Sequence, residues 1–267
     1  MLDKENPYAA PSASLNPDGG QDGAHFNPDG NVVGADRAMG WFGRGFDIFK
    51  SNPGIWIVSI IIYFIIIMIL AVIPLVNMAL SIFTPVFFGG FMLGCAAIAR
   101  GEELRIDHLF EGFQKHFGSL AIVGLITLGA WFVLTMMIVI VAFIALGLGG
   151  LGAMMSGGGS GQLASAMMAG GLVMVVLVLV GVALGIPIAM AGWFAPALVV
   201  FHNMSPIDAM KASFFGCLKN VVPFLIYGLL WLVFAVVASI PILLGWFVLV
   251  PVVIASVYAS YEDIYLS

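Results

Sequence analysis

Charged residues are confined to a few short parts of this chain, and long apolar stretches separate them. No Asp, Glu, Lys or Arg occurs between Gly118 and Ile207. All nine Lys and Arg lie in the N-terminal tail or within residues 37–50, 100–115 and 211–219. Unpaired charge is expelled from hydrocarbon, and there every backbone polar group must be satisfied within a helix or a closed barrel. The pattern therefore predicts a helical protein that crosses a membrane several times.

The composition excludes an ordinary water-soluble core. The chain is 62% hydrophobic and 9% charged, whereas soluble domains average about 25% charged residues. Most of the net charge of −5 lies in the N-terminal tail, so it does not indicate a nucleic-acid partner. Cys95 and Cys217 stand alone in separate segments, which predicts neither a disulfide framework nor a metal site.

The apolar stretches are long enough for six membrane-spanning helices. A spanning helix needs about 20 mostly apolar residues. The fourth stretch is long, and we expect Pro187 to kink it. Dividing it would give seven spans and place Lys211 and Lys219 opposite the other basic residues, which the positive-inside bias disfavours. The six expected spans lie at about 54–73, 76–99, 119–147, 171–202, 221–240 and 242–261.

With six spans, both termini and both charged loops share one side, which the excess of Lys and Arg predicts to be cytoplasmic. The uncharged Gly- and Ser-rich loop at 148–170 is then periplasmic. Residues 1–34 are polar and acidic, with Asn-Pro-Asp-Gly at 16–19 and again at 27–30. We expect 1–34 to be a disordered cytoplasmic tail and 35–267 to be a single membrane domain.

Prolines recur three times along the membrane domain, once between or within spans and again about ten residues later inside an apolar helix. The pairs are Pro74 and Pro85, Pro187 and Pro196, and Pro241 and Pro251. This predicts three tandem repeats, at about 36–100, 105–203 and 205–262. The expected fold is all-α, a polytopic transmembrane bundle of six helices built from three tandem helical hairpins.

A short amphipathic stretch precedes each expected hairpin. Apolar residues at helical spacing share one face of it, and charged residues lie opposite. We expect these stretches to be interfacial helices in the cytoplasmic head-group zone; the alternative is that they are short extensions of the spans. Ser205 followed by Pro206 predicts the start of the third. Their apolar faces comprise Met39, Phe42, Phe46 and Phe49; Ile106, Leu109, Phe110, Phe113 and Phe117; and Ile207, Met210, Phe214, Cys217 and Leu218.

Several short motifs resemble those of a proteobacterial family of uncharacterised inner-membrane proteins with an Asn-Pro-Tyr tail. They lie at residues 6–11, 45–46, 52–56, 84–95, 109–113 and 196–214. The chain is more faintly similar to the membrane domain attached to some glycerophosphodiester phosphodiesterases, in the style of its repeated helices alone. The resemblance implies a location in the bacterial inner membrane. It does not imply any biochemical activity.

No combination of residues in the sequence predicts catalysis. Asp107, His108, Glu111, His116 and Asp208 fall on expected interfacial faces, and His202 ends a span. We therefore expect no enzyme activity, no metal and no cofactor. Basic side chains beside the spans could contact anionic lipids, at about 1 kcal/mol each, or could serve only to orient the chain. These candidates are Arg100, Arg105, Lys115, Lys211 and Lys219.

Two functions remain for such a chain. The first is an integral inner-membrane protein that organises or senses the cytoplasmic leaflet, or scaffolds membrane partners there, with the lipid bilayer as its partner. The alternative is a carrier or channel for a small neutral or lipid-like substrate. A carrier would need polar side chains that converge on a pathway. The candidates for that lining are Asn77, Ser81, Thr84, Thr127, Thr135 and Tyr227.

Overall fold

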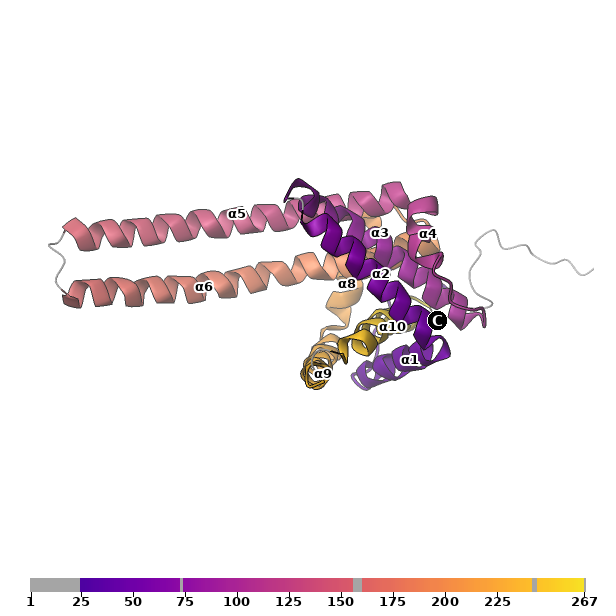
Figure 1. Ribbon diagram of the computed structural model, residues 1–267. Coiled ribbons are helices and arrows are strands. Elements are labelled where there is room, and N and C mark those ends of the chain that lie inside the picture. Colours follow the sequence, from indigo (N-terminus) through magenta and orange to yellow (C-terminus); the bar gives the residue numbers. More distant parts are fainter. Residues whose placement is uncertain (1–24, 73, 156–159, 242–243, 267) are drawn as a thin grey trace, which may run out of the picture.

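The computed structural model describes residues 25–72, 74–155, 160–241 and 244–266 (Figure 1). Its regular elements are helices, which confirms the all-α prediction; one isolated β-bridge joins Phe26 to Leu266. The helices are α1 (Arg37–Ser51), α2 (Pro53–Ala71), α3 (Pro74–Ala99), α4 (His108–Lys115), α5 (Phe117–Met155), α6 (Ser160–Trp193), α7 (Ala195–His202), α8 (Pro206–Lys219), α9 (Val221–Ser239) and α10 (Trp246–Tyr265).

Six candidate spans occur among the described residues, by length and composition. Two of them, in α3 and α10, have 56% and 61% of their residues buried inside the protein. The other four have between 6% and 22% buried. Apolar side chains that the protein does not cover must be covered by lipid in a membrane protein. The six spans are Pro53–Ala71, Ile82–Ala99, Phe117–Gly147, Gly170–His202, Val221–Ser239 and Trp246–Tyr265.

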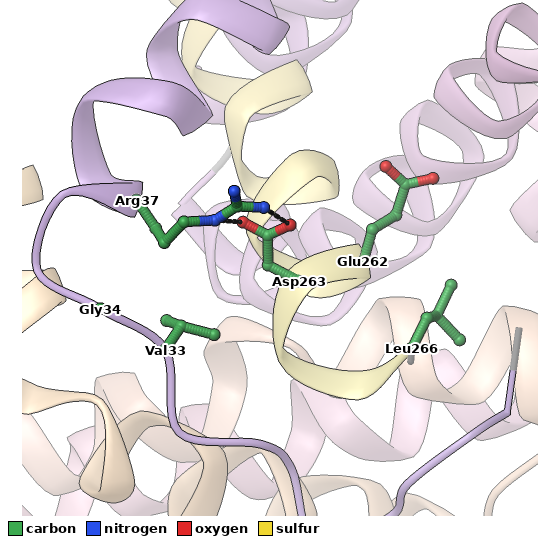
Figure 2. Close-up of a pocket in the computed structure, with 6 residues that line it drawn as sticks. All are labelled: Val33, Gly34, Arg37, Glu262, Asp263 and Leu266. Atoms are coloured by element: carbon green, nitrogen blue, oxygen red, sulfur yellow. Dashed lines mark hydrogen bonds and ion pairs between the residues drawn. The ribbon is translucent and has the colours of Figure 1, made fainter.

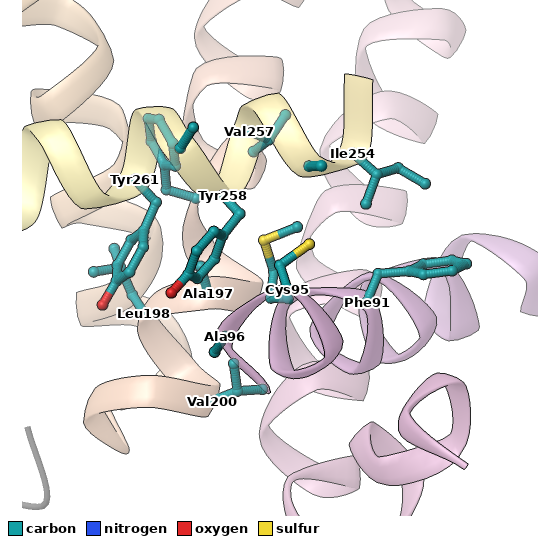
Figure 3. Packing of buried hydrophobic residues seen from close by; sticks show 14 of the residues in the cluster. Phe91, Cys95, Ala96, Ala197, Leu198, Val200, Ile254, Val257, Tyr258 and Tyr261 are labelled. Atoms are coloured by element: carbon teal, nitrogen blue, oxygen red, sulfur yellow. The ribbon is translucent and has the colours of Figure 1, made fainter. Parts of the chain in front are cut away.

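The protein core is built from the three helices that follow the repeated prolines. The part of α3 after Pro85 contacts α7, which begins just before Pro196, and also contacts α10. The ring centroids of Phe201 in α7 and Tyr258 in α10 are 5.9 Å apart, so each of these three helices contacts the other two. Figure 3 shows Cys95, Ala197 and Tyr258 meeting at its centre. The core therefore contains, from each of the three expected repeats, the segment around or after its second proline.

Each amphipathic helix packs against the proline-containing helix of the preceding repeat. Helix α4 contacts α3, α8 contacts α6 and α7, and α1 contacts α10 (Figure 1). The first two contacts join neighbours in the sequence, but the third joins the first and last described helices. The three expected repeats would thus close into a ring, and the contact of α1 with α10 is the ring closure.

Glycines make two of these helix contacts close. A Cβ built on Gly45 of α1 would lie 2.5 Å from the carbonyl oxygen of Val252 and 2.8 Å from the amide nitrogen of Ser256, both in α10. A Cβ on Gly112 of α4 would collide with the carbonyl oxygen of Val86 in α3. Val86 and Val252 directly follow Pro85 and Pro251, so the two contacts occur at equivalent places of the repeat.

The fourth span is interrupted at Phe194 and not at Pro187, which lies inside α6. The expected kink at Pro187 stays a prediction, and the break at Phe194 is a feature that we did not expect. A helix break leaves backbone groups that need partners. Ser213, which is fully buried, supplies them here: its hydroxyl accepts from the Phe194 amide at 2.9 Å and donates to the Met190 carbonyl at 2.6 Å.

The start of α8 follows the prediction. Ser205 accepts a hydrogen bond from the Asp208 amide at 3.2 Å, and Pro206 occupies the first turn. Asn203 ends α7 with φ of 49°, a left-handed conformation that Asn tolerates better than most residues. These two residues set the turn that brings α8 back onto α6 and α7.

Gly45→Ala should destabilise the protein, because its methyl group would meet backbone of α10 that has no free space to move into. We expect a cost of about 1–3 kcal/mol in the free energy of unfolding. The measurement is unfolding in detergent, followed by tryptophan fluorescence.

Gly43→Ala in the same helix is the matched control, because a Cβ there meets nothing within 4 Å. It should leave stability unchanged or raise it by up to about 1 kcal/mol through helix propensity. Equal behaviour of the two variants would show that α1 does not contact α10 at Gly45.

Candidate functional site

A cluster of ionic groups locks α1 onto the last turn of α10 (Figure 2). The Asp263 carboxylate accepts from Arg37 Nε at 2.9 Å and Nη2 at 2.6 Å, and from the Trp41 indole at 2.7 Å. Arg44 Nη2 lies 2.8 Å from the same carboxylate and also donates to the Ala259 carbonyl. The Asp263 side chain is only 8% exposed. Its hydrogen bond and charge raise the pKa of Arg37, so ring closure rests on a well-satisfied carboxylate.

The segment before α1 is held against the C-terminus. The Asn27 amide donates to the Tyr265 carbonyl at 2.8 Å, and the Asn31 amide donates to the Ile264 carbonyl at 2.6 Å. Asn220 accepts from the Val33 amide and donates to the Asn31 carbonyl, both at 2.8 Å. We expected residues 25–34 to belong to a disordered tail; instead their backbone groups find partners on α10 and at the end of α8. Residues 1–24 lie outside the described part of the chain.

Aromatic contacts join this segment to the core. The Phe26 ring stacks on His202 with centroids 3.4 Å apart, and His202 Nε2 lies 2.6 Å from the Tyr261 hydroxyl. His202, the histidine that ends the fourth expected span, is thus enclosed between the N-terminal segment and α10. Its contacts are those of a packed structural residue.

The amphipathic helices α1 and α8 each have a buried side and an open side. The buried side carries Trp41 and Phe42 on α1, and Ala209 and Ser213 on α8. The open side carries apolar residues, with Met39 55% and Ile207 57% exposed. Charged side chains lie among them: Lys50 Nζ is 5.0 Å from the centroid of the Phe46 ring, and helical spacing places Lys211 beside Ile207. The apolar faces that we predicted therefore divide into a part that packs on the core and a part that the protein leaves uncovered. The uncovered part is Met39 and Phe46 on α1 and Ile207, Phe215 and Leu218 on or beside the same face of α8.

Helix α4 is shorter and more enclosed. Leu109 is buried, and the Phe113 ring lies 4.9 Å from that of Phe87 in α3. Ile106 and Phe117, at the two ends of the helix, are the exposed apolar residues. Burial, with the charge of Lys115, lowers the pKa of His116 at the helix end.

The five candidate lipid-binding cations all have protein partners. Arg100, Arg105 and Lys211 pair with exposed carboxylates, and such pairs contribute little stability. Lys219 differs from the rest because it holds the N-terminal segment and not a carboxylate. The contacts are Arg100 to Glu102 at 2.8 Å, Arg105 to Asp107 at 2.7 Å, Lys115 to Glu111 at 3.5 Å, Lys211 to Asp208 at 4.0 Å, and Lys219 Nζ to the Asp29 carbonyl at 2.8 Å.

The candidate lining residues are distributed over several helices. Thr127 and Thr84 donate to carbonyls of their own helices, at 2.8 Å each. Thr135 lines an apolar groove between α5 and α6, and Tyr227 lies 2.7 Å from Ser256 inside the α9–α10 contact. Their convergence on a pathway stays a prediction. The side chains of Asn77 and Ser81 lie outside the described residues.

The titratable side chains of α4 and α8 that we considered for catalysis interact with neighbours on or beside their own helix. Among the described residues, no three His, Cys, Asp or Glu side chains gather where they could hold a metal ion. His108 lies 3.8 Å from Glu111 on its own helix, and Asp208 interacts with Ser205 at 2.6 Å. Burial raises the pKa of Cys217 to about 12, so this thiol is unreactive at neutral pH.

The residues that close the ring were missed at the level of the sequence. Arg37 and Arg44 were read only as part of a basic segment, and Glu262 and Asp263 fell just beyond the sixth expected span. The signal was nevertheless present: an acidic pair ends a chain whose first helix carries two arginines at positions that share a face.

The apolar helices, their uncovered surfaces and the charges at their ends define an integral membrane protein that crosses the bilayer several times. The chain is 32% identical, over 210 residues, to a probable inner membrane protein of Burkholderia thailandensis, covering 78% of this chain and 76% of the relative. It belongs to the same family of multi-pass inner-membrane proteins. No protein-family model and no solved structure matches the chain. The relative bears on neither the Asn-Pro-Tyr tail nor the similarity to the phosphodiesterase membrane domain.

Asp263→Asn should weaken ring closure strongly, because it leaves two guanidinium groups together without their shared anion. We expect a loss of about 2–4 kcal/mol in the free energy of unfolding. Asp47→Asn is the matched control: Asp47 pairs only with Lys50, at 2.8 Å on the open surface of α1, and should cost less than about 1 kcal/mol. Similar losses in unfolding experiments at low ionic strength would mean that Asp263 does not hold α1.

Proposed function

We propose that the protein organises the cytoplasmic leaflet of the inner membrane by holding amphipathic helices at the level of the lipid head groups. The observation that carries this proposal is that α1 and α8 are packed on the core along one side and leave apolar residues open on the other. Lysines accompany those open apolar residues, as Lys50 does over the Phe46 ring. An amphipathic helix in the head-group zone buries its apolar face about 5–10 Å toward the acyl chains.

The arrangement of charge supports the orientation. Arg100, Lys219 and Asp263 lie at or near the ends of α3, α8 and α10, outside the long uncharged stretches. We infer that these ends face the cytoplasm, because Lys and Arg accumulate on that side of inner-membrane proteins. The five candidate basic residues already have protein partners. We therefore propose that they mainly fix the orientation of the protein in the membrane, and only secondarily select lipids.

The packing favours an organising role over a carrier. The centre of the ring is filled by large buried side chains, among them Phe194, Leu198 and Tyr258. The groove between α5 and α6, of about 480 Å³, is lined by apolar residues except Thr135. A carrier for a polar solute needs polar groups that converge on its path, whereas Thr84 and Thr127 bond to their own helices and Tyr227 lies 2.7 Å from Ser256.

Removing the open apolar surface should abolish the effect on lipids and spare the fold. The test variant replaces Met39, Ile207 and Leu218, all exposed, with Ser. In vesicles of bacterial lipid, the wild-type protein should shift the emission of the packing-sensitive dye Laurdan toward looser packing. The variant should not, because Ser inserts poorly between acyl chains.

The control for that experiment is Lys50→Gln with Lys211→Gln. This variant removes one positive charge from each of α1 and α8 and keeps their exposed apolar side chains. This variant should behave as wild type. A triple Ser variant that loosens the lipid as much as wild type, while eluting as a folded protein, would contradict the proposed function.

The orientation makes a separate prediction. Single cysteines are introduced at Met168, which is exposed near the start of α6, or at Lys211 on α8, in a background with Cys95→Ala and Cys217→Ala. In intact spheroplasts, an impermeant maleimide should label Met168→Cys. Lys211→Cys should react only after permeabilisation. The reverse pattern would place α1, α4 and α8 on the periplasmic side.

A further inference from the structure

A surface hollow of about 410 Å³ lies beside the ring closure. It is lined by Val33, Gly34 and Arg37 from the N-terminal side, and by Glu262, Asp263 and Leu266 from the end of α10 (Figure 2). It therefore lies at the end of the helices where the charged residues collect. Val33 and Leu266 give it apolar walls.

The hollow and its surroundings carry equal numbers of positive and negative side chains. Two guanidinium groups, of Arg37 and Arg44, face two carboxylates, of Glu262 and Asp263. Asp263 is almost covered and is saturated by donors, whereas the Glu262 side chain is 25% exposed and has a long contact of 3.4 Å with Arg44. The Arg37 side chain is half exposed. Glu262 points away from the Arg37–Asp263 pair in Figure 2.

One accessible cation and one accessible anion therefore occupy separate parts of the hollow. A free anion would meet the two carboxylates, and a free cation would meet the two arginines. A zwitterionic ligand, which carries one positive and one negative group, satisfies the site best. The negative end of the α10 helix dipole further favours placing a cation near Glu262.

We propose that this hollow binds the zwitterionic head group of an ethanolamine phospholipid. The primary ammonium donates to the Glu262 carboxylate, which Tyr258 also approaches, and the phosphate accepts from the Arg37 guanidinium. The acyl chains leave past Val33 and Leu266. This inference deepens the proposed function and rests on it, because it names the lipid that the leaflet would supply.

The first test uses the full-length protein in nanodiscs that contain equal amounts of phosphatidylethanolamine, phosphatidylcholine and phosphatidylglycerol. Native mass spectrometry then counts the lipids retained after the disc is removed. We expect phosphatidylethanolamine to be enriched about tenfold over phosphatidylcholine, the worth of one charge-assisted hydrogen bond. Glu262→Gln should remove that enrichment, and Glu102→Gln, a change in an exposed carboxylate paired with Arg100, should keep it.

A second measurement needs no variant. Successive N-methylation of phosphatidylethanolamine removes hydrogen-bond donors while keeping the charge, so retention by the wild-type protein should fall stepwise to that of phosphatidylcholine. Equal retention across the series, retention of phosphatidylglycerol above the others, or undiminished enrichment in Glu262→Gln would each overturn the proposal.

Calorimetry with soluble glycerophosphoethanolamine separates a lipid from a free head group. Saturation at micromolar concentration without any retained phospholipid would assign the hollow to a soluble ligand, and would also overturn it. Because the Laurdan experiment tests the open apolar residues of α1 and α8 and not this hollow, failure of the lipid-binding proposal can be distinguished from failure of the proposed function.

Discussion

The contact between α1 and α10 is the interaction on which the rest of the molecule depends. The other two contacts between an amphipathic helix and a proline-containing helix join neighbours along the chain, and a short connection keeps them close. No short connection joins α1 to α10, so only non-covalent contacts hold these two helices together. A nearly covered carboxylate, Asp263, collects the donors of Arg37, Trp41 and Arg44, and Gly45 lets the backbones meet. Covering a carboxylate in this way is costly unless its partners replace the lost solvation, and these donors do so.

Much of the architecture could be predicted because the bilayer imposes strict rules. Apolar length predicted six spans, and the repeated prolines indicated which helices are equivalent. The helix break at Phe194 was not predicted. Pro187 and Pro196 are both prolines in one apolar stretch, and the break lies near the second, where Ser213 of α8 supplies hydrogen bonds. Nothing local in the sequence marks Ser213 as that partner, since it lies on another helix.

The candidate site was harder to predict for the same reason. The apolar faces of α1 and α8 follow from spacing, but spacing does not distinguish Phe42, which packs on Tyr227 at 4.6 Å, from Met39, which the protein leaves open. The meeting of Arg37 with Asp263 spans 226 positions of the chain, and it depends on the three repeats closing. The ordering of Asn27 and Asn31 depends on the C-terminus being present to receive them.

The spans differ in length to a degree that matters for the surrounding lipid. Helices α2 and α9 have 19 residues each, about 28 Å at 1.5 Å per residue, which matches a hydrocarbon core of about 30 Å. The apolar part of α5 alone has 31 residues, or about 46 Å. Helices α5 and α6 project side by side well beyond the other spans (Figure 1). The bilayer around the protein must therefore thicken on one side of it, or the α5–α6 pair must lean.

The adjacency of the first and last described segments has one more consequence. Phe26 bridges to Leu266, so these two segments are already neighbours in space. A ring of three repeats would have no privileged starting point. A circularly permuted chain that began at α4, with a linker between the segments that hold Phe26 and Leu266, would retain the contacts among the described helices. Its order of insertion into the membrane would change, while its final structure would not.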